Sequence, residues 1–113
     1  MENLNSLEIA LLKSIVEENG ERYPFLVSHI PYLKVKNREL TGVGSYSNFE
    51  YLQPVNESAI NTLLSSQKRL LISGLKTELS YVLDITNGKI NHLEIVTNDN
   101  EEWNGKTENF TLE

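Results

Sequence analysis

The sequence contains no cysteine, so disulfides, thiolate zinc sites and cysteine nucleophiles are all excluded. No apolar run approaches the roughly 20 residues that a membrane-spanning helix needs. Residues 1–5 carry no basic segment and no long apolar segment follows them, which predicts that there is no signal peptide. These absences together are typical of a protein in the reducing cytoplasm, and we expect that location.

Basic residues are also scarce, because ten lysines and arginines stand against sixteen aspartates and glutamates, for a net charge of −6. Phosphate backbones and anionic membrane surfaces repel such a chain, so we expect neither nucleic acid nor a membrane as a partner. A basic protein would be attracted to it. Mild acidity is, however, also ordinary for cytoplasmic proteins.

Recognisable catalytic motifs are missing as well. The only histidines are His29 and His92, too far apart in sequence for a His-x-His or His-x-x-x-His metal pair. The segment Gly42-Val43-Gly44 lacks the lysine, the third glycine and the following helix of a phosphate-binding loop. No Gly-x-Ser-x-Gly motif occurs. We therefore predict no metal and no cofactor.

Two helices are predicted at the start of the chain. Asn5 and Glu8 have the spacing of a capping box, and apolar residues then recur at helical spacing up to Asn19-Gly20, a pair typical of a left-handed helix end. A second, shorter helix is predicted to begin at Pro24 and to be limited by Pro31. The two would form a helical hairpin.

Strand patterns dominate the rest of the chain. Five strands are predicted, over residues 32–40, 41–52, 69–72, 79–86 and 89–96. The segment between the second and third strands favours either a short helix from Ser58 or an irregular loop. Helices followed by strands favour an α+β fold, here an N-terminal helical hairpin on one face of a roughly five-stranded antiparallel meander sheet. We predict one domain over residues 1–113, with helices at about 5–31, the sheet at about 32–97 and a polar tail at 98–113.

The clearest local signal is Asn87-Gly88, which predicts a hairpin turn between two apolar-rich strands. With a two-residue turn, His92 would oppose Leu83 and Glu94 would oppose Tyr81, whereas a three-residue loop would shift the pairing by one. In either register His92 and Glu94 share one side of a strand. Such a pair is a candidate for acid–base catalysis, and the alternative is two polar residues on a half-exposed sheet face.

The only tryptophan follows an acidic run. Trp103 is predicted either to pack on the core, which we favour, or to anchor a partner from an exposed position. The neighbouring Asp99, Glu101 and Glu102 would then be its solvated rim or an attractive patch for a basic partner. We take these four residues as candidate partner-binding residues.

The C-terminal two-thirds contain, in order, the short motifs Gly74-Leu75, Asn87-Gly88-Lys89, Leu93-Glu94 and Glu102-Trp103. This set resembles the pattern of Gly-Leu, Asp/Asn-Gly-basic, Leu-Glu and Glu-x-Trp in a widespread group of small, uncharacterised bacterial proteins. The chain differs after Glu94, where Ile95-Val96-Thr97 stands in place of the usual glycine and aromatic residues. The resemblance implies a fold and adds little chemistry.

Three functions are compatible with these observations. The first is a non-enzymatic protein-binding module, for instance an immunity-like protein that neutralises a basic toxin. The second is a small-molecule-binding protein or enzyme with His92 and Glu94, and with His29 or Tyr81, at the helix–sheet junction. The third is an oligomer formed through an edge strand, although Lys34, Lys36 and Arg38 on the first strand are typical of edge protection. We therefore expect a monomer or a homodimer.

Overall fold

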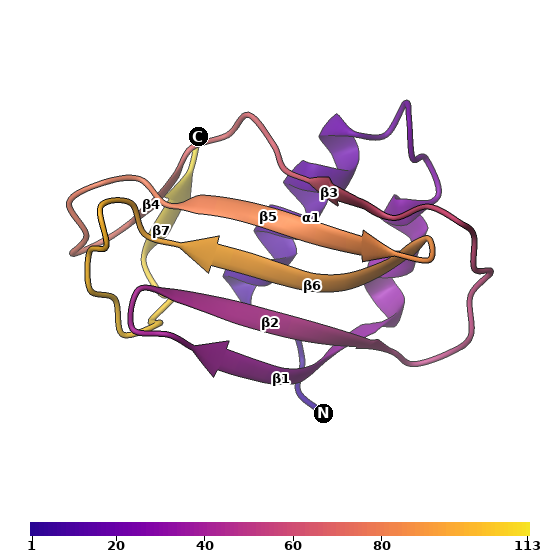
Figure 1. Ribbon diagram of the computed structural model, residues 1–113, viewed down its shortest axis with the longest axis horizontal. Coiled ribbons are helices and arrows are strands. Elements are labelled where there is room, and N and C mark those ends of the chain that lie inside the picture. The colour runs from indigo at the N-terminus through magenta and orange to yellow at the C-terminus, as the bar shows by residue number, and fades with distance from the viewer.

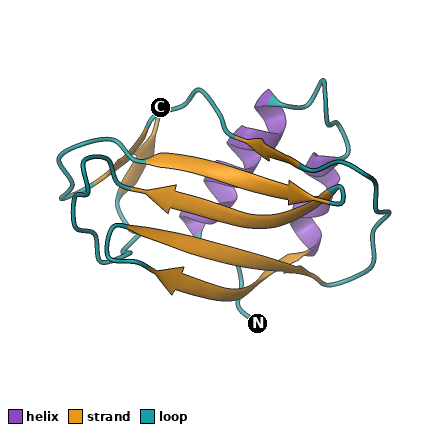
Figure 2. Ribbon diagram, in the orientation of Figure 1, coloured by secondary structure: helices purple, strands orange, loops and turns teal.

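The computed structural model describes residues 1–113 and has the predicted α+β architecture. Its helices and strands, in chain order, are α1 (Ser6–Glu18), the 3₁₀ helix η1 (Leu26–Tyr32), β1 (Leu33–Leu40), β2 (Gly44–Tyr51), β3 (Thr62–Leu64), β4 (Leu70–Ile72), β5 (Ser80–Thr86), β6 (Lys89–Val96) and β7 (Phe110–Leu112). Both helices lie behind the large sheet (Figures 1 and 2).

Helix α1 begins with the predicted capping box. The Asn5 side chain accepts a hydrogen bond from the Glu8 amide, and the Glu8 carboxylate accepts one from the Asn5 amide, both at 2.8 Å. The predicted left-handed end is wrong, because neither Asn19, with φ −104°, nor Gly20 has positive φ. The Asn19 side-chain amide instead donates to the Ile15 carbonyl at 2.7 Å. The predicted second α-helix is a seven-residue 3₁₀ helix that continues through Pro31, so α1 is the only α-helix.

The main sheet is antiparallel but is not the predicted meander. Its strand order is β1-β2-β6-β5-β3, so β3, the next strand after β2 in the chain, lies at the far edge of the sheet. Strand β6 pairs with β2 where Gly44 allows a close approach, since a Cβ there would lie 2.7 Å from the Ile95 carbonyl oxygen. Long-range pairing of this kind decides the strand order, and short connections do not reveal it.

Two short strands were not predicted. Strand β3 lies in the segment for which the sequence favoured a helix or an irregular loop, and it pairs with β5 at the sheet edge. Strand β7 lies in the predicted polar tail and pairs with β4 in a separate two-stranded sheet. The predicted strand at residues 69–72 therefore exists but does not belong to the main sheet.

The β5–β6 hairpin has the predicted two-residue turn, with φ of 53° at Asn87 and 74° at Gly88. A bulge then inserts one extra residue, Asn91, so that His92 opposes Asp84 and Glu94 opposes Val82. The predicted partners Leu83 and Tyr81 are wrong for this reason. The bulge puts Ile90 on the same core-facing side of β6 as Leu93 and Ile95, so all three are buried.

The core lies between the large sheet and the helices. It is built from twenty buried apolar side chains, which include five from α1 and three each from β5 and β6. Trp103 from the C-terminal segment belongs to the same cluster. Because one face of the sheet covers this core, the face opposite to it is left for other contacts.

Candidate functional site

No helix covers the face of the five-stranded sheet that points away from α1 (Figure 1). Paired residues in an antiparallel sheet share a face, so the register and the alternating burial identify its members. We call this set the outer face: Lys34, Asn37, Glu39, Tyr46, Asn48, Glu50, Leu63, Ser80, Val82, Asp84, Thr86, Lys89, His92, Glu94 and Val96. It carries four carboxylates and two amines.

Tyr46 and His92 lie at the centre of the outer face, on the neighbouring strands β2 and β6. Their rings are edge to face, with centroids 6.0 Å apart. Glu94 is the cross-strand partner of Tyr46, and its carboxylate raises the pKa of the Tyr46 hydroxyl. The Asp84 carboxylate, opposite His92, accepts a hydrogen bond from the side-chain amide of Asn91 at 3.1 Å. Two aromatic rings are thus flanked by carboxylates.

The structure does not bring the four candidate residues of an acid–base site together. His92 and Glu94 are half-buried on the outer face, and neither lines any of the five main cavities. Tyr81 lies on the opposite, core-facing side, where its hydroxyl donates to the Lys68 carbonyl at 2.6 Å. His29 is buried in η1, on the helix side of the sheet.

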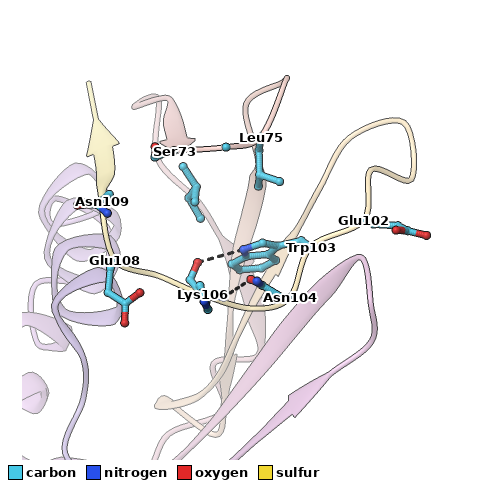
Figure 3. A pocket seen from close by; sticks show the side chains of 10 residues that line it. Ser73, Leu75, Glu102, Trp103, Asn104, Lys106, Glu108 and Asn109 are labelled. Carbon is cyan, nitrogen blue, oxygen red and sulfur yellow. Dashed lines mark hydrogen bonds between the residues drawn. The ribbon is translucent and has the colours of Figure 1, made fainter.

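Trp103 packs on the core, with 6% of its surface exposed. Its indole N–H donates to the Lys106 carbonyl at 3.1 Å (Figure 3). An open cavity of about 340 Å³ lies beside the indole, and Leu75 and Glu108 help to line it (Figure 3). The packing prediction is confirmed, so the alternative prediction of an exposed tryptophan anchor is wrong.

The acidic residues beside Trp103 have different surroundings. The Glu101 carboxylate accepts hydrogen bonds from the backbone amides of Lys76 at 2.8 Å and Thr77 at 3.4 Å, so it holds the β4–β5 connection. Asp99 and Glu102 are exposed. Only these two carboxylates of the predicted patch are therefore fully available to a partner.

A hydrogen-bonded pair of His29 and Tyr51 lies on the helix side of the sheet. The Tyr51 hydroxyl is 2.8 Å from Nδ1 of His29 and accepts a hydrogen bond from the Ile90 amide, also at 2.8 Å. Burial raises the pKa of Tyr51 to about 12. Burial also lowers the pKa of His29, and the nearby positive charge of Lys89 lowers it further. The sequence places a tyrosine and a histidine in apolar segments but does not show that they meet.

A second polar cluster joins α1 to the sheet. The Arg38 guanidinium donates to both carboxylate oxygens of the buried Glu8, at 2.9 and 2.8 Å, and Ser47 donates to the same carboxylate. Burial opposes ionisation of Glu8, but these hydrogen bonds and that from Asn5 outweigh it and lower the pKa of the carboxyl. Sequence reasoning identified Glu8 only as a capping residue.

No protein-family model, no curated protein and no solved structure matches this chain. The resemblance to the group of small bacterial proteins stays a prediction. No helix of the protein is long and apolar enough to cross a membrane. Histidine, aspartate and glutamate side chains nowhere gather in a group of three that could hold a metal ion.

Proposed function

We propose that the protein is a non-enzymatic protein-binding module of the cytoplasm, and that its outer face binds a basic partner protein. The single observation that carries this proposal is the uncovered sheet face with four carboxylates around Tyr46 and His92. An immunity-like role, in which the partner is a basic toxin, is the form of the proposal that we favour.

The chemistry of the outer face supports a basic partner. Arginine and lysine side chains pair with carboxylates and also stack on aromatic rings, so a tyrosine between acidic residues suits them. Glu39 and Glu94 lie on either side of Tyr46 in one cross-strand row. Phosphate groups and a second copy of the same face would both be repelled, which disfavours nucleic acid and a face-to-face homodimer.

The size of the outer face is compatible with a protein interface. Strands about 4.8 Å apart and up to eight residues long give a flat area of about 500 Å² for the sheet of five strands. The side chains project from the sheet and enlarge its accessible surface toward the roughly 800 Å² that each partner buries in an ordinary complex. The exposed side chain of Leu63, on the edge strand β3, would add an apolar contact at the rim.

The experiment compares two variants with the same charge change. The outer-face variant carries Glu39→Gln, Asp84→Asn and Glu94→Gln, and the control carries neutral substitutions at three exposed glutamates elsewhere, Glu17→Gln, Glu21→Gln and Glu108→Gln. Each protein is immobilised and exposed to lysate of its own cells at low salt, and the captured protein is purified. Its dissociation constant is then measured by calorimetry.

The proposal expects a basic protein that binds the wild type and the control in fixed stoichiometry. If each lost carboxylate contributes about 0.5 kcal/mol, the outer-face variant binds about tenfold more weakly. Equal weakening in both variants would show that only net charge matters. That result, or the absence of any stoichiometric partner, would refute the proposal.

A further inference from the structure

A cavity of about 570 Å³ lies between η1 and the chain that leaves β2. Its lining is mixed: Phe25, Tyr32, Val55 and Ile60 provide apolar surface, and His29 lines it together with Glu57 and smaller polar side chains. Volumes of 300–1,000 Å³ with apolar walls and a few polar groups are typical of small-molecule sites. None of the outer-face residues lines this cavity, so what it binds is independent of the proposed function.

The hydrogen bonds of Tyr51 determine which nitrogen of His29 carries the proton. The Tyr51 oxygen already accepts from the Ile90 amide, and the only acceptor within reach of its own proton is Nδ1 of His29. Nδ1 of the neutral ring therefore accepts, and the ring proton resides on Nε2.

The Nε2 group has no partner within the chain, although the residue is 93% buried, with 7% of its surface exposed. No buried side-chain nitrogen or oxygen lacks a hydrogen-bond partner, so Nε2 is in contact with solvent. His29 lines the cavity, and we infer that Nε2 meets solvent there. A pocket with partly apolar walls thus presents one oriented N–H donor.

We propose that this cavity, which we call the η1 cavity, binds a small uncharged aromatic or aliphatic molecule whose carbonyl or hydroxyl oxygen accepts a hydrogen bond from Nε2–H of His29. The walls provide apolar burial for the body of the molecule, and His29 provides its orientation. An uncharged ligand fits best because the flanking charges of Lys89 and Glu57 already pair with each other, at 3.8 Å.

The segment of residues 53–57 gives a ligand access. No backbone hydrogen bond joins it to the rest of the chain. It is held at its ends, where the Leu52 amide donates to the Tyr32 carbonyl at 2.8 Å and the Ser58 amide donates to the Asn87 carbonyl at 3.1 Å. Its displacement would therefore break one polar contact, the exposed pair of Glu57 and Lys89, besides the packing of the half-buried Val55.

The test uses benzamide as the probe and toluene as the matched molecule without an acceptor. Each is titrated into isotope-labelled protein, and the backbone amide and His29 imidazole resonances are followed by NMR. Benzamide should shift residues 25–32 and 54–60 saturably, with a dissociation constant on the order of 1 mM. Toluene should bind about three- to tenfold more weakly, which is the value of one neutral hydrogen bond.

Three variants separate the possible outcomes. Val55→Trp should fill the cavity and weaken benzamide binding at least about tenfold, whereas Val27→Trp, on the exposed side of η1, should leave it unchanged. His29→Phe should remove the preference for benzamide over toluene. If the His29→Phe variant does not fold, the Val55→Trp variant still tests whether benzamide binds in the η1 cavity. Unsaturable shifts, equal binding of the two probes by the wild type, or unchanged binding by Val55→Trp would overturn the proposal.

Discussion

Replacing Glu8 by glutamine should destabilise the protein far more than the same change at an exposed ion pair. Glutamine keeps the shape of the side chain and its capping oxygen, since glutamine also serves at this position of a capping box. The substitution therefore removes mainly the negative charge that the Arg38 guanidinium contacts at 2.9 and 2.8 Å.

The expected cost follows from the burial of the two partners. Removing one member of a fully buried ion pair costs about 3–5 kcal/mol. The Glu8 side chain is only 2% exposed, but that of Arg38 is 30% exposed and keeps a second contact with Glu2 at 2.7 Å. Water and Glu2 can thus stabilise Arg38 in the variant, and we expect a loss of about 2 kcal/mol.

The control is Glu78→Gln, which removes the partner of Arg69. There too a guanidinium Nε lies 2.8 Å from a carboxylate oxygen, but the side chains are 61% and 47% exposed. We expect a loss of less than about 1 kcal/mol. Both variants can be unfolded in urea with the fluorescence of the buried Trp103 as the signal, and a loss of about 2 kcal/mol lowers the midpoint by about 1 M.

Equal losses in the two variants would refute this reasoning. In that case the energetic contribution of the Glu8 cluster would not depend on its burial. A double-mutant cycle with Arg38→Gln would then show how much of the loss comes from the pair itself and how much from the remaining contacts of Glu8.

Three further predictions concern stability and ionisation. The pKa of Glu8 in the folded protein lies below its ordinary value of 4.5. The stabilisation by its charge is therefore present above pH 4.5 and disappears as the pH falls through the folded pKa. The difference in unfolding free energy between the wild type and Glu8→Gln should accordingly shrink on acidification. Tyr51→Phe should lower the free energy of unfolding by about 1–3 kcal/mol, because it leaves the backbone amide of Ile90 in β6 without its acceptor. It should also remove the tyrosine with a pKa of about 12 from an ultraviolet pH titration. Gly88→Ala should destabilise more than Gly74→Ala in urea unfolding, because both positions have positive φ but only at Gly88 would the added Cβ clash, with the hydroxyl oxygen of Ser58.

Features with a local cause could be predicted from the sequence. The capping box of α1 depends on two residues three positions apart, Asn5 and Glu8, and it forms as expected. The hairpin turn depends on Asn87-Gly88 alone, because these residues adopt positive φ readily. Neither feature needs information from distant parts of the chain.

Features with a non-local cause could not be predicted. The bulge at Asn91 is explained by the burial of Ile90, Leu93 and Ile95 together, which strict alternation within β6 does not allow. Strands β3 and β7 have only three residues each, too few to show a period. The pairing of β2 with β6 joins residues about fifty positions apart.

The candidate sites divide in the same way. The alternation in β6 placed His92 and Glu94 on one side of the strand, as the structure has them, but could not show that this side is uncovered. The pair of His29 and Tyr51 is separated by 22 positions. A histidine between apolar residues of η1 was the one available signal that a buried polar partner was needed.

The most direct measurement of the central claim is an NMR titration of the labelled protein with its captured basic partner. We predict that the perturbed amides will cluster on β2, β5 and β6 around Tyr46 and His92, and that the outer-face variant will lose these perturbations. Perturbations that cluster instead at Asp99 and Glu102, or around the η1 cavity, would contradict the assignment of the outer face as the binding surface.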